Sequence, residues 1–470
     1  MIDEQSSTAD GRQVTVVVLN WNGRRLLPDC LDAVAKQDLD RGLWETWVVD
    51  NASEDDSLEL LARDYPWVRV VRNDANLGYA GGNNTALRTA TTPYIVLLNN
   101  DAYPEPDWLR RLVATIEAGD DDVGRVAAVT SKVLFAPRFL AVEIETPALS
   151  VPGDPRDLGM LVTQVRLDGE DVAEDLLWDH GAYGPEESGG TRFRWTRPAG
   201  SVLVPVGAGS GAGQTLGHDL RLTVRARADR TKPLTLRWPG GAATVELTEA
   251  EGDHEVVVPA GTPLVDVVNN VGSVFHAPGY GADRGYQQVD EGQFATAEDV
   301  PMLCGAAVLL RKAALEQVGV FDDDFFLYYE DTDLSWRLRA AGWNIRYEPT
   351  AVVRHLHSAS SVEWSPFFTF HVERNRLLTL TKDAPAGLAL RQVLRFQVTT
   401  ASMTRRALVQ ALRERHRPAL RPLLLRLRVT ASYLRLLPRM LWRRRAITRT
   451  ATTSRGALFA RWMTTDPKGT

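Results

Sequence analysis

The chain has 470 residues, of which 44% are hydrophobic and 24% charged, a composition typical of a folded protein with two or three domains. Residues 1–12 are polar and acidic and lack the apolar run of a secretory signal, so we expect a cytoplasmic protein. Cys30 and Cys304 are the only cysteines and neither belongs to a CxxC pair, which argues against a disulfide scaffold and a structural zinc site.

The formal net charge of −6 conceals two oppositely charged parts. From Ala386 to the C-terminus there are 19 Lys and Arg residues against two acidic ones, which leaves the preceding part at about −23. Arginines interrupt every candidate for the roughly 18 uninterrupted apolar residues that a membrane span needs. If this basic tail meets a membrane, we expect it to lie on the surface.

Residues 13–135 alternate short β-branched runs with amphipathic stretches. This βαβα order predicts an α/β fold with a mostly parallel sheet and helices on both faces. Ser53, three residues before Asp56, suits the N-cap of a helix. The expected strands cover residues 13–20, 45–50, 67–71, 94–98 and 125–133, and the expected helices lie near 26–35, 55–64, 81–89 and 107–118.

The segment YIVLLNND, residues 94–101, combines a buried strand with a polar end. Ligands of open α/β sheets bind at the carboxyl ends of strands. Asp101, preceded by two amides, is therefore well placed to hold a divalent cation against a phosphorylated substrate. The alternative is that Asp101 begins a turn or caps the next helix.

Residues 136–262 are rich in Gly, Pro and Thr and carry alternating strand patterns between turn signals, which predicts an inserted β-sandwich-like domain. Trp178, Trp195 and Trp238 are candidates for stacking on sugar rings, although tryptophans of a sandwich core give the same pattern. The α/β pattern resumes at residues 263–383. There we expect a strand at 305–311, helices at 312–318 and 330–341, and two short strands, RYEP and AVVRH.

Three carboxylates, Glu330, Asp331 and Asp333, gather at the start of the helix expected at 330–341, next to several aromatic residues. Acidic residues favour helix N-termini for electrostatic reasons alone. An aromatic wall, however, desolvates a carboxylate and raises its pKa toward neutrality, as a general base requires.

Seven blocks of sequence occur in a fixed order along the chain: VVVLNWNG, VVDNASED, NDANLGYAGGNN, LLNNDAYP, CGAAVLLRKAAL, FFLYYEDTDLSWRLRAAGW and AVVRHLHSASS. Together they resemble family 2 glycosyltransferases with the GT-A fold. The resemblance covers residues 13–133 and 269–361, about half of the chain, and is nearest to the rhamnosyltransferase-like branch that includes galactofuranosyltransferases. It implies a nucleotide-sugar-binding half at 13–135 and an acceptor or catalytic half at 263–383.

The resemblance implies roles for particular residues. Asp331 matches the catalytic base, with Glu330 beside it, while Asp101 and His355, whose near neighbour is His357, match ligands of Mg²⁺ or Mn²⁺. Many relatives carry two or three carboxylates where Asn99, Asn100 and Asp101 supply one, so Asp101 should hold metal poorly until a donor diphosphate arrives. The nucleotide pocket would comprise Asn20, Asn22, Asp50, Asn76, Gly78, Gly82, Asn99 and Asn100, each of which also suits a turn. The acceptor region would comprise Cys304, Gly305, Asp333 and Arg337.

Two further parts of the chain have open readings. Arg284 could meet a diphosphate or form a surface ion pair. In residues 384–470, leucines at helical spacing alternate with arginines, and Pro418, Pro422 and Pro438 predict a series of short helices. The basic helices of 386–463 could bind an anionic membrane surface or dock on the acidic body. Nucleic acid is not expected, because few aromatic residues interleave with the basic ones.

The predicted function is metal-dependent, inverting transfer of rhamnose or galactofuranose from a nucleotide diphosphate donor to a glycan or polyprenyl-linked acceptor. The setting would be assembly of bacterial cell-envelope polysaccharide at the inner face of the plasma membrane. One alternative is a non-catalytic glycan-binding protein on the same scaffold. The other is a sugar-nucleotidyltransferase, for which LNWNGRRLL offers only a weak triphosphate loop.

Overall fold

The computed structural model describes residues 11–122, 125–149, 153–207, 214–276, 279–356, 365–415 and 420–464. The chain forms two compact units. One contains residues 1–134, 269–286 and 292–470, and the other contains residues 135–268 and 287–291.

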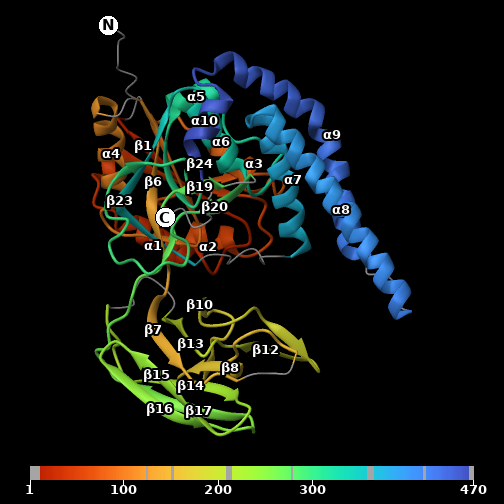
Figure 1. Ribbon diagram of the computed structural model, residues 1–470. Coiled ribbons are helices and arrows are strands. Elements are labelled where there is room, and N and C mark those ends of the chain that lie inside the picture. Colours follow the sequence, from red (N-terminus) through yellow and green to blue (C-terminus); the bar gives the residue numbers. More distant parts are fainter. Residues whose placement is uncertain are drawn as a thin grey trace. The chain divides into compact units, whose positions relative to one another are not determined.

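A curved sheet forms the core of the first unit (Figure 1), and its strand order is β3-β2-β1-β4-β22-β6-β23-β21. The strands β3, β2, β1 and β4 are parallel. Because β22 is antiparallel to both β4 and β6, β6 points the same way as β4. The predicted α/β class with a mostly parallel sheet is confirmed. The strands are β1 (Val14–Asn20), β2 (Trp44–Asp50), β3 (Arg69–Arg72), β4 (Tyr94–Asn99), β6 (Val126–Phe135), β21 (Glu298–Asp299), β22 (Ala307–Arg311) and β23 (Asn344–His355), with β5 (Ala102–Pro104) on β23 and β18 (Val268–Asn270) on β6.

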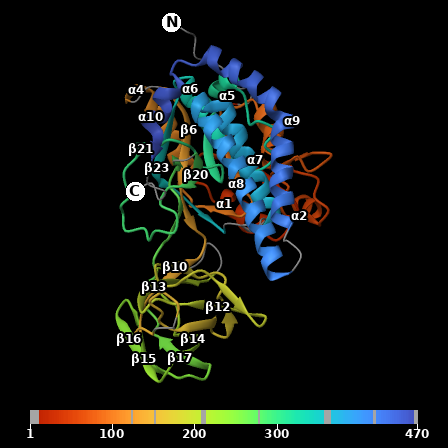
Figure 2. The same cartoon turned by 45° about the vertical axis from the view of Figure 1, so that its right-hand side comes forward.

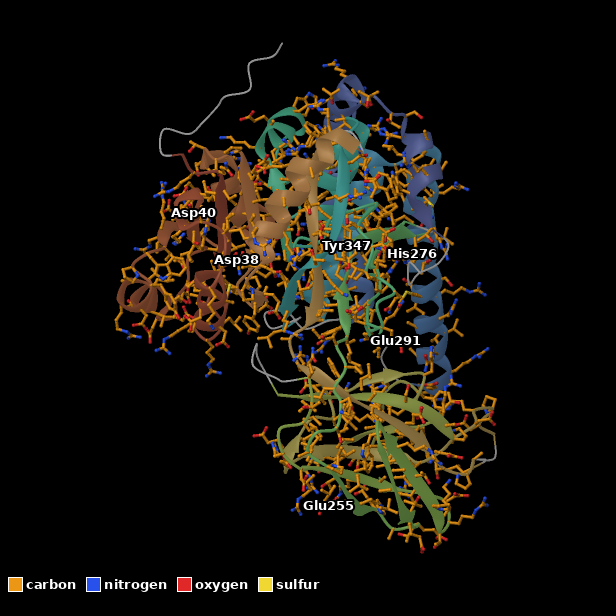
Figure 3. The ribbon with its side chains drawn as sticks, turned by 90° about the vertical axis from the view of Figure 1, so that its left-hand side faces the viewer. Asp38, Asp40, Glu255, His276, Glu291 and Tyr347 are labelled. Atoms are coloured by element: carbon orange, nitrogen blue, oxygen red, sulfur yellow. The ribbon has the colours of Figure 1, made fainter. Side chains whose placement is uncertain are left out.

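β23 is one continuous strand of 12 residues, so the prediction of two short strands was wrong. Pro349 does not interrupt it, because Pro349 lies between the positions that pair with β21 and those that pair with β5. Tyr347, labelled in Figure 3, is fully buried on this strand and donates its hydroxyl to the Phe294 carbonyl at 3.0 Å.

The helices of this unit follow the expected segments closely. They are α1 (Leu27–Ala35), η1 (Arg41–Leu43), α2 (Ser57–Asp64), α3 (Gly78–Thr89), α4 (Trp108–Asp122), α5 (Lys312–Val318) and α6 (Glu330–Ala340). Ser53 does not cap α2, whose N-cap is Asp56. Its hydroxyl instead accepts hydrogen bonds from the Asn22 backbone and the Asn20 side chain, at 3.0 and 3.1 Å.

The second unit is a two-sheet β-sandwich with one apolar core, to which both sheets contribute valines and leucines. One sheet has the order β10 (Leu177–Asp179), β13 (Ala199–Val206), β7 (Arg138–Glu145), β15 (Lys232–Trp238) and β16 (Gly241–Leu247). The other has the order β11 (Glu186–Ser188), β12 (Thr191–Trp195), β8 (Leu161–Leu167), β14 (Leu220–Arg227) and β17 (Gly252–Val258), with β9 (Glu170–Asp171) on β8.

Two of the tryptophans considered for sugar stacking belong to this core. Trp238 is buried within it, and Trp178 packs against it. Trp195 is half-buried on β12. Of the two alternatives for Trp178 and Trp238, packing in the sandwich core is therefore the one that the structure supports.

The C-terminal part of the first unit consists of α7 (Pro366–Asp383), α8 (Ala386–Glu414), α9 (Arg421–Thr450) and α10 (Arg455–Trp462). Figure 2 shows α7, α8 and α9 as a group of long helices. The strand β24 (Met463–Thr464) joins β19 (Ser273–His276), which pairs with β20 (Tyr280–Asp283). No helix in the described part of the chain combines the length and hydropathy needed to cross a bilayer.

Pro422 and Pro438 do not divide the chain into short helices, so the expectation was wrong for these two prolines. Pro422 occupies the first turn of α9, where no backbone N–H is needed. Pro438 lies inside α9, and the helix continues through it because neighbouring residues such as Leu436 and Met440 are buried in the core shared with α7. Pro418 lies outside the described residues.

Candidate active site at the carboxyl ends of the strands

Polar side chains at the ends of β1, β2 and β4 contact one another. Asn20 is fully buried; its Nδ2 donates to Asp50 Oδ1 at 3.3 Å, and its Oδ1 accepts from Asn100 Nδ2 at 3.2 Å. The parallel register explains this, because Asn20 lies opposite Asp50 and Leu19 lies opposite Asn99. A Cβ on Gly23 would lie 2.2 Å from Asn100 Nδ2, so this loop requires glycine. Sequence reasoning missed Gly23, although the text NWNG contains the signal.

The loops that follow β1 and β2 are tied together by an amide. Asn22, at φ 51°, accepts a hydrogen bond from the Glu54 backbone at 2.7 Å. Asn22, Asn20 and Asp50 therefore lie at one edge of the sheet.

Asn51 organises the loop before α3 and was missed by sequence reasoning. This amide is buried; its Nδ2 donates to Asn76 Oδ1 at 2.9 Å, and its Oδ1 accepts from the Leu77 N–H at 3.1 Å. Asn76 Oδ1 also accepts from the Gly78 N–H at 2.9 Å. Asn76 thus holds the loop conformation from within. The signal was the Asn that follows Asp50 in VVDNASED.

Gly78 and Gly82, two glycines of the predicted nucleotide pocket, lack side chains for reasons within the fold. Gly78 has φ 70°, and a Cβ there would lie 2.3 Å from the Phe326 carbonyl oxygen. A Cβ on Gly82 would lie 2.5 Å from Leu19 Cδ1, because α3 packs closely on β1. Packing within the protein therefore accounts for both glycines.

Asp101 and His355 meet at the ends of β4 and β23. His355 Nε2 lies 3.0 Å from Asp101 Oδ1 and 3.3 Å from Asn99 Nδ2, and both His355 and Asp101 are buried. His355 Nδ1 faces Asn269 Oδ1 at 3.1 Å, an amide oxygen that fixes the orientation of the ring. Within the described ranges, no group of three or more His, Cys, Asp and Glu side chains could hold a metal ion. His357 lies outside those ranges.

Glu330 and Asp331 begin α6 and have different environments. Asp331 is partly exposed, and burial, with the negative charge of Asp283, raises its pKa to about 6 although Thr332 and Gly305 donate backbone hydrogen bonds to it. Glu330 is buried, and its Oε2 finds no hydrogen-bond partner among the residues that the structure describes. Burial, with the charge of Asp331, raises the pKa of Glu330 well above its usual range. Asp331, with a pKa of about 6, is therefore the carboxylate of this pair that can accept a proton at neutral pH.

A three-residue segment connects Asp331 with the end of β4. Gly305 donates its backbone N–H to Asp331, and the Ala306 carbonyl accepts from the Asn99 N–H at 2.9 Å. Tyr79 of α3 donates its hydroxyl to the Gly305 carbonyl at 2.6 Å. Cys304 is buried, and burial raises the pKa of its thiol, so it packs here as a neutral side chain.

Asp333, Arg337 and Arg284 do not contact open space at the site. Asp333 is fully buried and pairs with Arg337 at 2.9 Å and with Lys382 at 2.6 Å. Arg337 also donates to the carbonyls of residues 318–320. Asp333 and Arg337 lie one helical turn apart on a side of α6 that faces the protein interior. Their assignment to the acceptor region is therefore corrected. Arg284 pairs with Glu298 at 2.5 Å, which removes it as a diphosphate ligand.

Comparison with known families agrees with this geometry. The model of Glycosyl transferase family 2 matches residues 15–142, which carry the strand ends, and the model of Glycosyltransferase like family 2 matches residues 254–376, which carry Asp331 and His355. The chain belongs to glycosyltransferase family 2. The resemblance predicted from the seven sequence blocks is confirmed at this level.

Curated relatives of this family 2 glycosyltransferase match over short stretches. N-acetylglucosaminyl-diphospho-decaprenol L-rhamnosyltransferase of Mycobacterium tuberculosis is 46% identical over 67 residues, which is 14% of this chain and 22% of that protein. Glycosyltransferase AglE of Haloferax volcanii is 30% identical over 115 residues, which is 24% of this chain and 38% of that protein. The chain therefore aligns with well under half of the length of either relative.

Among solved structures, S. aureus TarS 1–349 in complex with UDP overlaps 93% of this chain and 88% of that chain, with 13% identity and a TM-score of 0.38. Since that score is low, the functional argument below depends on the residues of this chain.

Proposed function

We propose that this family 2 glycosyltransferase transfers a sugar from a nucleoside diphosphate donor to an acceptor hydroxyl, with inversion at the anomeric carbon. The observation that carries the proposal is Asp331: a partly exposed carboxyl group whose pKa is about 6, at the start of α6 and one short segment from the polar end of β4. A base with that pKa is ionised at pH 7 and still accepts a proton from an alcohol as it attacks.

The donor nucleotide would bind at the ends of β1, β2 and β4. Asn20, Asp50 and Asn100 already form a network there that fixes their orientation before a ligand arrives. Ordering polar groups in advance reduces the entropy lost on binding. In the reaction, Asp331 would receive the proton of the acceptor hydroxyl while that oxygen attacks the face opposite the leaving diphosphate.

The pair Asp101 and His355 suits Mg²⁺ or Mn²⁺. Two neighbouring ligands of an octahedral ion with bonds of about 2.1 Å are about 3.0 Å apart, and Asp101 Oδ1 and His355 Nε2 are separated by 3.0 Å. The contact between His355 Nδ1 and Asn269 Oδ1 orients the ring so that Nε2 faces Asp101. When bound, such an ion neutralises charge on the departing diphosphate. With two protein ligands, affinity for the ion should depend on the donor phosphates.

The deciding experiment is a panel of nucleotide sugars tested with Mn²⁺ and with chelator. Thermal stabilisation by a donor identifies its nucleotide and sugar, because a ligand that binds the folded state raises the melting temperature. Release of free nucleoside diphosphate with an acceptor lipid extract then reports transfer. Asp331→Asn should keep donor binding and lower turnover by about 100-fold or more. Turnover within threefold of the wild type would remove Asp331 from the role of base.

We propose rhamnose as the first donor sugar to test and galactofuranose as the second, with a glycan or polyprenyl-linked acceptor in cell-envelope polysaccharide assembly. The rhamnosyltransferase of Mycobacterium tuberculosis supports this order through its 46% identity over 67 residues. Stabilisation by neither donor, together with stabilisation by a third, would overturn it.

We also propose that α8 and α9 rest on an anionic lipid surface, the side from which a lipid-linked acceptor would come. Each helix exposes a stripe of large apolar side chains with arginines along one side, a pattern that suits lipid headgroups above acyl chains. The stripe on α8 contains Leu390, Leu394, Val398, Leu408 and Leu412, and that on α9 contains Leu424, Leu427, Leu434, Leu441 and Trp442. The adjacent exposed arginines are Arg391, Arg395, Arg406 and Arg413 on α8, and Arg421, Arg428 and Arg435 on α9.

A further inference from the structure

The segment that leads into Asp331 has an unfavourable backbone conformation. Phe326, Tyr328 and Tyr329 have φ values of 68°, 68° and 71°, in the left-handed region that bulky side chains avoid. Such a residue is strained and persists only when its surroundings hold it in place. Tyr329 is also the N-cap of α6, so the direction in which α6 begins depends on this segment.

One buried amide holds the segment. Nδ2 of Asn375, on α7, lies 2.9 Å from the Phe325 carbonyl, 2.8 Å from that of Leu327 and 2.7 Å from that of Tyr328. Asn375 is fully buried, so these hydrogen bonds do not compete with water. Nδ2 carries two hydrogens, so the three carbonyls share its two N–H donors, and one amide group binds the whole segment.

Arg374 supports Asn375 from the neighbouring position. Its Nε donates to Asn375 Oδ1 at 2.8 Å, which fixes the amide so that Nδ2 faces the carbonyls. Its Nη2 donates to the carbonyls of Asp324 at 3.1 Å and Phe325 at 2.7 Å. Two adjacent buried side chains of α7 are thus committed to one segment.

The same segment contacts the loop assigned to the donor nucleotide. The Phe326 carbonyl accepts from the Ala80 N–H at 3.1 Å, and Gly78 lacks the Cβ that would collide with it. Asn84 of α3 donates to the Phe321 carbonyl at 2.8 Å. The segment therefore links the start of α3 to the start of α6, and its shape sets how Asp331 faces the donor side.

We propose that Asn375 is a positioning residue for glycosyl transfer: by holding residues 325–329 in a conformation in which three of them have positive φ, it fixes Asp331 relative to the donor loop. The inference depends on the proposed role of Asp331 as the base. Without the amide, the segment can relax toward ordinary φ values, and the first turn of α6 then moves or frays. Asp331 would lose its partly buried setting while the sheet that carries Asn20 and Asp50 stays in place.

The test compares Asn375→Ala and Asn375→Asp with Thr379→Val in the full-length protein. Asn375→Asp keeps the size and replaces the donor by an acceptor, which the three carbonyls repel. Thr379 lies one turn further along α7, is buried, and has a hydroxyl with no hydrogen-bond partner in the described part of the chain, so Thr379→Val controls for a change in the buried face of α7. We would measure kcat against pH, donor dissociation constants, and hydrogen exchange of residues 325–331.

Both Asn375 variants should lower kcat per folded molecule by at least tenfold and speed exchange of residues 325–331 by at least tenfold. The acid limb of their kcat profile should move below that of the wild type, because a more solvated Asp331 ionises at lower pH. Thr379→Val should match the wild type in each measurement. A role in folding alone would lower the folded fraction and leave the acid limb in place.

The proposal is overturned if kcat per folded molecule stays within threefold of the wild type, or if the acid limb does not move in either variant. Should one variant fail to fold, the other decides. Should both fail, hydrogen exchange on the wild type decides. Exchange of residues 325–331 as fast as that of an exposed loop would overturn the proposal. Protection equal to that of α7 would support the role of Asn375 in holding the segment. Absence of transfer by the wild type with every nucleotide sugar would instead refute the proposed function.

Discussion

Glu330 and Asp331 are neighbours in sequence, but the structure gives them different environments. Burial raises the pKa of Glu330 well above its usual range, whereas Asp331 is partly exposed and receives backbone hydrogen bonds that keep its pKa near 6. The sequence predicted a carboxylate cluster beside aromatic residues, and this cluster indicated the candidate site. It could not separate the members, because burial depends on the direction in which each side chain leaves the first turn of α6.

The raised pKa of Asp331 predicts that this carboxylate destabilises the fold. Between about pH 4 and 6 the folded protein binds more protons than the unfolded chain, so stability falls as pH rises through this window and stays lower above it. Asp331→Asn should therefore be more stable than the wild type at pH 8, by about 3 kcal/mol, and nearly equal to it at pH 4. Urea denaturation at the two pH values measures this. The exposed carboxylate in Asp56→Asn serves as a control, and an equal gain there would contradict the assignment.

The proposed metal role of Asp101 and His355 makes a separate prediction. Asp101→Ala and His355→Ala should each weaken donor binding by at least tenfold in Mn²⁺, because each would remove one of the two proposed protein ligands, and should have little effect in chelator. Isothermal titration with the donor that best stabilises the wild type gives the donor dissociation constant in Mn²⁺ and in chelator. Equal weakening with and without the ion would show that the pair acts only as an internal contact.

At the scale of elements, glycine positions test the packing of α3. Gly78→Ala places a Cβ 2.3 Å from the Phe326 carbonyl at a positive φ, and should destabilise the protein by about 2–4 kcal/mol. Gly387→Ala is the matched control: it lies in α8 with no atom within 4 Å of the new Cβ, and should be neutral or stabilising by up to about 1 kcal/mol. Thermal denaturation of the two variants measures both. A Gly78→Ala protein as stable as the wild type would show that the segment at Phe326 can move away.

The elements that the sequence predicted well are those whose signals are local. β1, β2 and β4 are buried runs that are rich in apolar and β-branched residues, so the sequence of each segment is sufficient to predict a strand. Pro349 and Pro438 misled the prediction because tertiary contacts override their local effect. Pro349 lies between the positions of β23 that pair with β21 and those that pair with β5. Pro438 lies within a helix whose neighbouring residues are buried in the core shared with α7. Asn375 was beyond sequence reasoning, since this buried amide is recognised only by the distant backbone carbonyls that it contacts.

At the scale of the whole chain, arginines of the basic tail form ion pairs with carboxylates of the acidic body that precedes it. Arg443 of α9 contacts Asp322 and lies 2.7 Å from Asp324, which also pairs with Arg439 at 2.7 Å. Of the two alternatives for the tail, docking accounts for the face of α9 that these arginines occupy. It does not account for the apolar stripes on the other faces of α8 and α9, for which the lipid surface remains a proposal.

That proposal predicts which side chains carry the binding. Vesicles with about 30% anionic lipid should sediment the wild type, and the triple substitution Leu394→Gln, Leu412→Gln and Trp442→Gln should lower binding by at least fivefold, because each exposed side chain loses apolar area that the bilayer would cover. Val257→Gln, at an exposed valine of the sandwich, should bind like the wild type. Binding should weaken in neutral vesicles and in high salt, since the arginines lose their counter-charge. Unchanged sedimentation of the triple variant would contradict the proposal. So would a wild-type dimer that the triple substitution disperses, since the stripes would then bind a second copy of the chain.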